Sequence, residues 1–130
     1  MQKAQQSRIL VVDDEPDILN LLEYNLKRAG FQAILAKDGP EAIEAAKAHR
    51  PDLVLLDIML PDMEGTEVLR RLKAVEATAS IPVIMLTAKG EEVDKIVGFE
   101  LGAEDYITKP FSPRELILRV KAVLKRTAER

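Results

Sequence analysis

The chain has 130 residues, carries a net charge of -3 and contains no cysteine. This length fits one domain with one core, the lack of cysteine excludes thiol chemistry and cysteine-ligated zinc, and the charge gives no overall nucleic-acid footprint. Because the apolar runs are too short to span a membrane and the first residues lack a signal-peptide core, we expect a cytoplasmic protein with no membrane contact.

The first half of the chain alternates short apolar runs with helical patterns. The run 9–12 predicts a strand, and a helix is expected over 16–30, with a proline at its start and a glycine at its end. A second strand over 31–36 and a short helix over 39–49 follow. The next apolar run ends at Asp57 and predicts the third strand, because continuous aliphatic runs are typical of buried parallel strands.

The second half repeats this alternation. A loop leads into a third helix, a fourth strand begins at Pro82, and a fourth helix is expected over about 91–101. After a short fifth strand, Ser112, Pro113 and Glu115 occupy the N-cap, N1 and N3 positions of a capping box that starts the last helix. The five alternations predict an α/β fold, a parallel sheet covered by helices on both faces.

Four of the apolar runs end in a polar residue of one particular chemistry. Asp13 and Asp14 follow the first run, Asp57 the third, Thr87 the fourth and Lys109 the last. In an open α/β sheet the ligand site lies outside the carboxyl ends of the strands. We therefore expect three carboxylates, one hydroxyl and one ammonium to converge at a single edge of the sheet.

That set of groups suits a divalent cation and a phosphoryl group. Clustered carboxylates repel one another unless a cation compensates them, and oxygen-only ligands favour Mg²⁺ or Ca²⁺ over a transition metal. A shell completed by waters and phosphate oxygens fits Mg²⁺. A carboxylate can also act as a nucleophile and form an aspartyl phosphate, whose charge Lys109 would neutralise and whose oxygens Thr87 would hydrogen-bond.

Taken singly, most of these residues have an ordinary explanation. Asp14 follows a strand and fits a helix N-cap, Thr87 fits a strand end, and Lys109 fits a solvated surface charge. Asp57 is different, because apolar residues flank it on both sides and place it at the rim of the core. The functional interpretation rests on the fact that all of these polar residues occur together, each at the end of a predicted strand.

Four segments together resemble the signature segments of bacterial response-regulator receiver domains: ILVVDDEPDI, DLVLLDIMLPDMEG, PVIMLTA and DYITKPF. The similarity implies a receiver domain over 8–126, a disordered extension over 1–7, and a tail or linker start over 127–130. It also implies a flavodoxin-like (CheY-like) doubly wound fold. Such a fold has five parallel strands in the order 2-1-3-4-5 and five helices.

The resemblance assigns roles to the carboxylates. It implies that Asp57 accepts a phosphoryl group from the histidine of a sensor kinase. Asp13 and Asp14 match the acidic pair of the Mg²⁺ site, whose direct ligands would be Asp14, Asp57 and the backbone carbonyl of Met59. Mg²⁺ is the cofactor expected. The protein would be a signalling switch that promotes its own phosphorylation and dephosphorylation, not a conventional enzyme.

The resemblance also points to a conformational switch. Thr87 matches the switch hydroxyl, Tyr106 the switch aromatic, and Lys109 the lysine of the site. We expect phosphate on Asp57 to draw Thr87 inward and to let Tyr106 move from an exposed to a buried position. The turn that aims Lys109 back at the site suits a cis bond to Pro110, which the resemblance makes more probable than in proteins generally.

The stretch 87–116 is especially similar to the OmpR/PhoB subfamily of transcription factors, which carry a C-terminal winged-helix DNA-binding domain. The resemblance therefore implies control of transcription through an output domain outside these residues, and contact with DNA only through that domain. The alternative is a stand-alone, single-domain response regulator that acts by protein–protein interaction.

Phosphorylation is expected to create a homodimer through the fourth helix, fifth strand and fifth helix of the predicted fold. Helical phase places Phe99 opposite the buried stripe of its helix with Ile96 beside it, and places Leu118 opposite the buried stripe of the last helix. These three would form an apolar patch. The subfamily resemblance pairs the surrounding charges across a two-fold axis: Lys95 with Glu115, Glu104 with Arg126, and Asp105 with Arg119.

Three other classes of protein fit these residues less well. A flavodoxin-like flavin protein needs a glycine-rich phosphate loop after the first strand, where Asp13, Asp14 and Glu15 would repel phosphate. An aspartate-based phosphohydrolase carries a second aspartate two residues after its nucleophile, but here Glu15 stands there. A docking module that takes no phosphate would not need the full set of five polar residues.

The phosphoryl donor is expected to lie outside this chain. The sequence has no P-loop motif, so ATP is not the expected donor. His49 is the single histidine, and it is predicted at a helix C-terminus, where the helix dipole favours a surface cation. The donor histidine must then belong to another protein.

Overall fold

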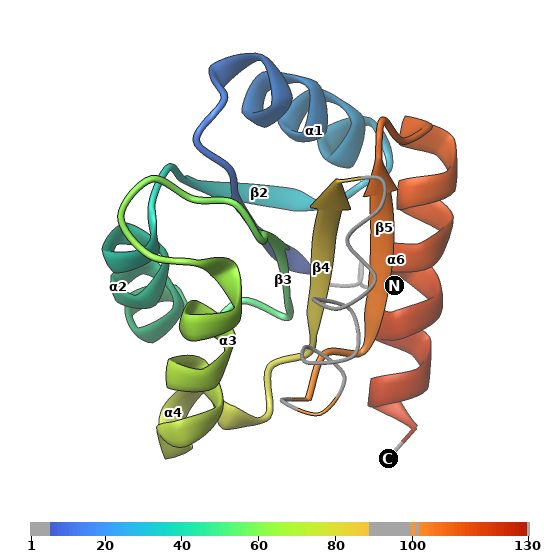
Figure 1. Cartoon of the computed structure of the whole chain (residues 1–130). Coiled ribbons are helices and arrows are strands. Elements are labelled where there is room, and N and C mark those ends of the chain that lie inside the picture. The colour runs from blue at the N-terminus through green and yellow to red at the C-terminus, as the bar shows by residue number, and fades with distance from the viewer. Residues whose placement is uncertain (1–5, 89–99, 101, 130) are drawn as a thin grey trace.

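The structure is a computed structural model that describes residues 6–88, 100 and 102–129. Figure 1 shows its elements, which in chain order are β1 (Arg8–Val12), α1 (Pro16–Arg28), β2 (Gln32–Ala36), α2 (Gly39–His49), β3 (Leu53–Asp57), α3 (Gly65–Ala74), α4 (Glu76–Ala79), β4 (Val83–Ala88), β5 (Asp105–Lys109) and α6 (Pro113–Ala128). Apart from residue 100, the helix predicted over 91–101 lies outside the described residues. None of the described helices combines the length and apolar character needed to cross a membrane.

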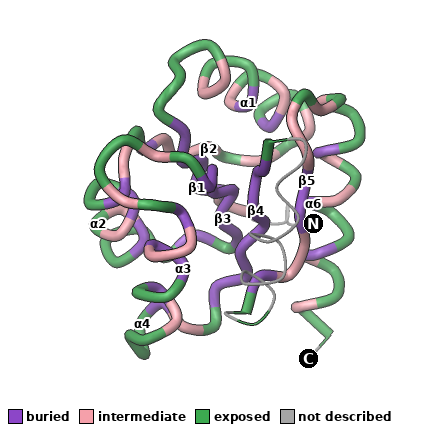
Figure 2. Tube along the Cα trace, viewed as in Figure 1, coloured by how far each residue is buried: buried purple, intermediate pink, exposed green. Residues whose placement is uncertain are grey.

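Five parallel strands form one sheet in the order β2-β1-β3-β4-β5, which confirms the predicted topology. Every residue of β3 is buried, as expected for a continuous apolar run in a strand with neighbours on both sides. Figure 2 shows this buried zone along the middle of the sheet. The chain order reverses between β1 and β3, and such a switch point leaves room for a ligand outside the carboxyl ends of the strands.

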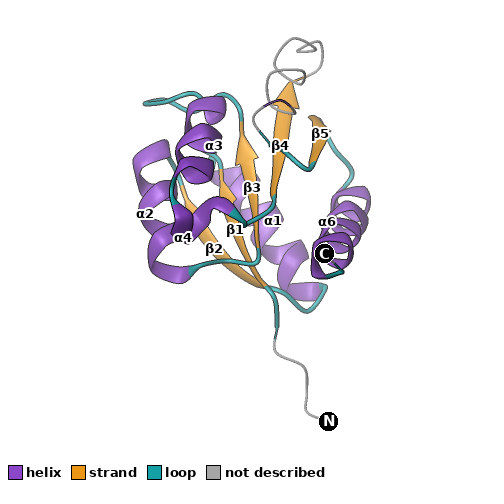
Figure 3. Ribbon diagram, turned by 90° about the horizontal axis from the view of Figure 1, so that it is seen from below, coloured by secondary structure: helices purple, strands orange, loops and turns teal. Residues whose placement is uncertain are grey.

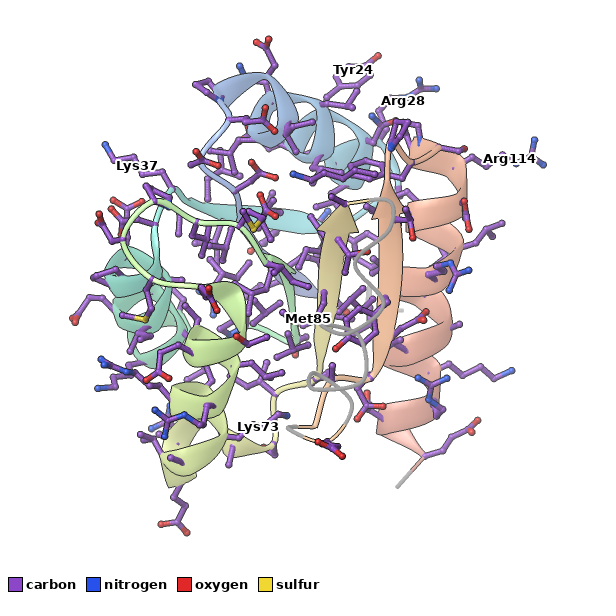
Figure 4. All side chains as sticks on the ribbon, in the orientation of Figure 1. Tyr24, Arg28, Lys37, Lys73, Met85 and Arg114 are labelled. Atoms are coloured by element: carbon purple, nitrogen blue, oxygen red, sulfur yellow. The ribbon has the colours of Figure 1, made fainter. Side chains whose placement is uncertain are left out.

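Helices cover both faces of the sheet (Figure 3). α1 and α6 pack on one face, while α2 and α3 pack on the other. Successive strand residues alternate between the two layers: Ile9 and Val11 face the first pair of helices, and Leu10 and Val12 face the second. Met85, labelled near the middle of the sheet in Figure 4, is fully buried. Each strand is thus held by two apolar layers, which fixes the position of the residue at its end.

The predicted helix starts are confirmed at both ends of the chain. Pro16 begins α1, and Pro113 begins α6. The Ser112 hydroxyl accepts a hydrogen bond from the Glu115 N–H at 3.3 Å and so caps α6. α6 runs to Ala128, into the segment that the sequence marks as a tail.

The short helix α4 was not predicted. Thr78 Oγ1 donates to the carbonyl of Leu72 at 2.6 Å, and Lys73 Nζ donates to the carbonyls of Ala79 and Ile81 at 3.1 and 2.9 Å. These bonds fasten the connection between α3 and β4. A helix of one turn shows no periodicity in the sequence, so its residues could not be distinguished from a loop.

The capping bond of α6 gives a stability prediction. Ser112→Ala should lower the free energy of unfolding by about 1 kcal/mol, because the Glu115 N–H loses its acceptor. Ser112→Asp restores an acceptor and should cost less than half as much. Urea unfolding followed by circular dichroism measures both values, and equal losses would show that the cap does not stabilise the helix.

Candidate functional site

The strand register brings four side chains to one edge of the sheet. β1 and β3 pair side by side, so Asp13 and Asp57 come together where these strands end. β4 and β5 do the same for Thr87 and Lys109. In Figure 1 the arrowheads of β4 and β5 point to this common edge. The residues expected to converge therefore lie on neighbouring strand ends.

Three carboxylates form an oxygen cluster at this edge. Asp13, Asp14 and Asp57 each offer an oxygen atom, and these atoms all lie within 4.8 Å of one another. Asp13 is 0% exposed and Asp57 4%, whereas Asp14 faces solvent. Oxygen-only donors with one open side fit Mg²⁺, which keeps part of its water shell. The residues present therefore suit the cation that the sequence indicates.

Lys109 is the counter-charge of this cluster. Its Nζ lies 3.0 Å from Asp13 Oδ2, 3.0 Å from Asp57 Oδ2 and 3.6 Å from Glu15 Oε1. Glu15 was not among the predicted site residues. The available signal was its place directly after the acidic pair, but a position before Pro16 fits a helix start equally well. One ammonium is thus shared by three carboxylates.

Backbone N–H groups hold the two buried carboxylates in place. The Met59 N–H donates to Asp57 Oδ1 at 3.1 Å, and the Glu15 N–H donates to Asp13 Oδ1 at 2.9 Å. The side chain of Met59 is exposed. A cleft of about 340 Å³ opens beside these groups, lined by Asp14, Glu15, Asp57, Met59, Ala88 and Lys109. The cleft gives a small anion or a peptide group access to Asp57.

The charges of the site shift one another's pKa. The pKa of Asp57 is raised from 3.8 to about 6, mainly by burial. The Lys109 hydrogen bond lowers this pKa, the charge of Asp13 raises it, and the Met59 N–H lowers it. Burial lowers the pKa of Lys109, but its hydrogen bonds to Asp13 and Asp57 outweigh this effect and raise it overall. Lys109 therefore stays protonated at neutral pH, and an ionised Asp57 is costly without a further cation.

Thr87 and Tyr106 lie on neighbouring strands near this edge. Thr87 is 0% exposed, and within the described part of the chain its Oγ1 is a buried side-chain atom with no hydrogen-bond partner. A buried hydroxyl in this state is ready to donate to an incoming oxygen atom. Tyr106 is 7% exposed. It is thus buried without phosphate, whereas an exposed position was expected before phosphorylation. The Lys109–Pro110 bond is cis, as the sequence indicated.

The predicted dimer face is only partly described. Lys95, Ile96 and Phe99 lie outside the described residues. Leu118 is 60% exposed, in agreement with its helical phase. Several of the charges expected to pair between two chains form ion pairs within one chain: Arg119 with Asp105 at 3.0 Å, Arg119 with Glu115 at 3.1 Å, and Arg126 with Glu104 at 3.5 Å. The pairing between chains stays a prediction.

Comparison with known proteins identifies the relatives of this chain. The family described as "Response regulator receiver domain" matches residues 9–121. The alkaline phosphatase synthesis transcriptional regulatory protein PhoP of Bacillus subtilis is 54% identical over 120 residues, which cover 92% of this chain and 49% of that protein. The phosphate regulon transcriptional regulatory protein PhoB of Pseudomonas aeruginosa is 55% identical over 119 residues, with 92% and 52% covered. The chain thus spans about half the length of these curated relatives.

Solved structures agree with the sequence relatives. A CheY-like response regulator receiver domain protein from Methanospirillum hungatei superposes with a TM-score of 0.90 at 31% identity, covering 96% of this chain and 98% of that one. The chemotaxis response regulator CheY4 of Vibrio cholerae gives a TM-score of 0.87 at 29% identity, covering 92% and 99%. The similarity therefore includes the whole receiver fold.

The raised pKa of Asp57 predicts a pH-dependent stability. Because the folded protein holds this proton more tightly than the unfolded chain, the stabilising effect is complete below about pH 4 and is lost as the pH rises through about 6. Asp57→Asn removes the ionisation. In metal-free buffer the variant should therefore gain about 3 kcal/mol relative to the wild type from about pH 4 to about pH 7.

Urea unfolding across this pH range measures the gain. Asp62→Asn, in the exposed loop that follows β3, is the matched control and should not reproduce it. A stability difference between Asp57→Asn and the wild type that is the same at every pH would contradict the raised pKa.

Proposed function

Because this chain belongs to the response-regulator receiver family, we propose that it accepts a phosphoryl group on Asp57 from the phosphohistidine of a sensor kinase. The observation that carries the proposal is the shared ammonium of Lys109, 3.0 Å from both Asp13 and Asp57, beside a buried Thr87 hydroxyl that has no hydrogen-bond partner among the residues the structure describes. A site built from buried carboxylates, one cation and a free donor is suited to a transferred anion. The domain is a signalling switch and not a conventional enzyme.

The proposed transfer step needs mainly positioning and neutralisation of charge. A carboxylate oxygen of Asp57 attacks the phosphorus, a P–O bond forms, the P–N bond to the donor imidazole breaks, and the imidazole leaves with the electron pair and takes up a proton. Lys109 neutralises the phosphoryl oxygens from one side. The Thr87 hydroxyl donates a hydrogen bond to one of them.

We assign the divalent cation to the three carboxylates. Asp13, Asp14, Asp57 and the backbone carbonyl of Met59 would hold Mg²⁺, which supplies charge neutralisation at the phosphoryl oxygens. The spacing of the three carboxylate oxygens supports this choice, as does the fact that the cluster found among the described residues offers oxygen donors alone. The cation would also compensate the buried charge of Asp57, whose pKa is raised mainly by burial and further by the charge of Asp13.

The switch and the dimer extend the proposal. A phosphoryl oxygen bonded to Thr87 would draw that hydroxyl toward Asp57, and Tyr106 would respond on the neighbouring strand. The dimer would form through the expected helix over 91–101 together with β5 and α6, with Leu118 in its apolar centre. Arg119 and Arg126 would then give up their ion pairs within one chain and form the same pairs with the other chain across the two-fold axis. Because the number of ion pairs stays the same, these charges would set the register of the dimer more than its affinity.

The proposed output is control of transcription. Both curated relatives are named as transcriptional regulatory proteins and are about twice as long as this chain. We propose that DNA is contacted through a domain outside residues 8–126, with residues 127–130 leading toward it, and that the protein works in the cytoplasm. A receiver that acts by protein–protein interaction alone is the alternative, and assay of the full-length gene product for DNA binding separates the two.

The phosphosite is tested by mass spectrometry after incubation with Mg²⁺ and acetyl phosphate, a small acyl phosphate donor. One phosphoryl adduct per chain should appear, should map to Asp57 and should be lost when Mg²⁺ is chelated. Asp57→Asn should carry no adduct, while the control Asp62→Asn should react like the wild type. An adduct of equal stoichiometry on Asp57→Asn would overturn the assignment.

The dimer is tested by sedimentation of the protein with beryllofluoride, a mimic of the phosphoryl group. The wild type should dimerise, and Leu118→Asp should weaken the dimer by roughly tenfold or more, because a charge replaces an apolar contact at the centre. Arg119→Glu should weaken it as well, and adding Asp105→Arg should restore part of the loss. Arg114→Glu, which makes the same charge change at an outward-pointing position of α6 (Figure 4), is the control. A dimer indifferent to Leu118→Asp would rule this face out.

A further inference from the structure

We propose that Gly65 is a positioning residue for the phosphoacceptor. Its lack of a side chain lets the first turn of α3 rest on the peptide between Asp57 and Ile58 and so fixes the direction of the Asp57 carboxylate. The inference rests on the proposed function of Asp57 and adds to it a residue that touches neither substrate nor metal.

The first observation is a close approach between two pieces of backbone. A Cβ atom at Gly65 would overlap the carbonyl oxygen of Asp57, and it would lie 2.7 Å from Cα of Ile58 and 3.0 Å from the carbonyl carbon of Asp57. All three are backbone atoms, so no flexible side chain can turn away to make room. Any other residue at this position must move either α3 or the peptide that carries the phosphoacceptor.

The second observation is that this peptide and the one after it are both held by hydrogen bonds. The Ile58 N–H of the Asp57–Ile58 peptide donates to the carbonyl of Leu86 in β4 at 3.0 Å, and the carbonyl of the next peptide, that of Ile58, accepts from the Gly65 N–H at 2.7 Å. On the same loop the Met59 N–H donates to Asp57 Oδ1 at 3.1 Å. A shift of the peptide would therefore also move the Asp57 carboxylate.

The expected consequence is a misplaced carboxylate. Relief of the overlap requires a displacement of roughly 0.5–1 Å. The Asp57 carboxylate lies 3.0 Å from Lys109 and within 4.8 Å of the carboxylates of Asp13 and Asp14. A shift of this size therefore weakens its ion pair with Lys109 and disturbs the spacing of the three carboxylates. Displacements of about 1 Å in a reacting group cost on the order of 100-fold in rate.

Gly39 provides a matched control within the same molecule. It is buried and is the first residue of α2, just as Gly65 is the first residue of α3. The atoms nearest to a Cβ at Gly39 belong to side chains, Met63 at 3.0 Å and Val68 at 3.1 Å. Gly39→Ala therefore introduces the same methyl group at the same helix position, but with milder crowding and against side chains instead of the phosphoacceptor peptide.

The experiment compares Gly65→Ala with Gly39→Ala by two readouts. The first is the NMR amide resonance of Met59 in metal-free protein, which reports the hydrogen bond to Asp57 Oδ1 and requires no phosphorylation. The second is the rate of phosphorylation by acetyl phosphate with Mg²⁺. Gly65→Ala should shift the Met59 resonance and slow the reaction by about 100-fold. Gly39→Ala should leave the resonance in place and the rate within about threefold, even if it unfolds more easily.

Each outcome decides the proposal. An unshifted Met59 resonance in Gly65→Ala, or equal loss of rate in both variants at matched folded fractions, would overturn it. If the wild type accepts no phosphoryl group, the proposed function fails, while the metal-free resonance still decides the positioning role. If the single variant Gly65→Ala does not fold, the Met59 resonance is measured in the double variant with Asp57→Asn. The side-chain oxygen of Asn at position 57 still accepts a hydrogen bond from the Met59 N–H.

Discussion

The structure depends on a set of like charges held at the rim of an apolar core. Asp13 and Asp57 are buried at neighbouring strand ends with Asp14 beside them, and the Lys109 ammonium is shared by Asp13 and Asp57. Burial of uncompensated carboxylates is costly, which is why the pKa of Asp57 rises to about 6. The packing of the fold keeps these carboxylates together despite their repulsion. A bound cation or a substitution of Asp57 should therefore change the stability of the protein strongly.

The parallel sheet makes such a cluster possible. Its strands are packed between two helical layers, so the residues at their carboxyl ends have little freedom to move apart. Backbone hydrogen bonds from Glu15 and Met59 orient the carboxylates, and the close seat of Gly65 against the Asp57 peptide fixes the loop behind them. This rigidity supports the proposal that a change of charge at this edge shifts the position of Thr87.

Much of this arrangement is readable from the sequence, because it follows from short-range rules. Apolar runs ending in Asp57 or Thr87 mark strand ends, and the capping pattern at Ser112 marks the start of a helix. The rest depends on contacts between distant segments. Glu15 reaches Lys109 only through folding, and the ion pair of Arg119 with Asp105 forms within one chain where subfamily resemblance pairs them across a dimer.

The central claim, that the carboxylate cluster is built for one divalent cation, is tested most directly by the dependence of the unfolding free energy on Mg²⁺ at neutral pH. Stability should rise by about 1.4 kcal/mol for each tenfold increase in Mg²⁺ above its dissociation constant. Asp14→Asn should flatten this dependence, and the control Asp62→Asn should retain it. A wild-type stability that does not change with Mg²⁺, or an equal slope in Asp14→Asn, would contradict the claim.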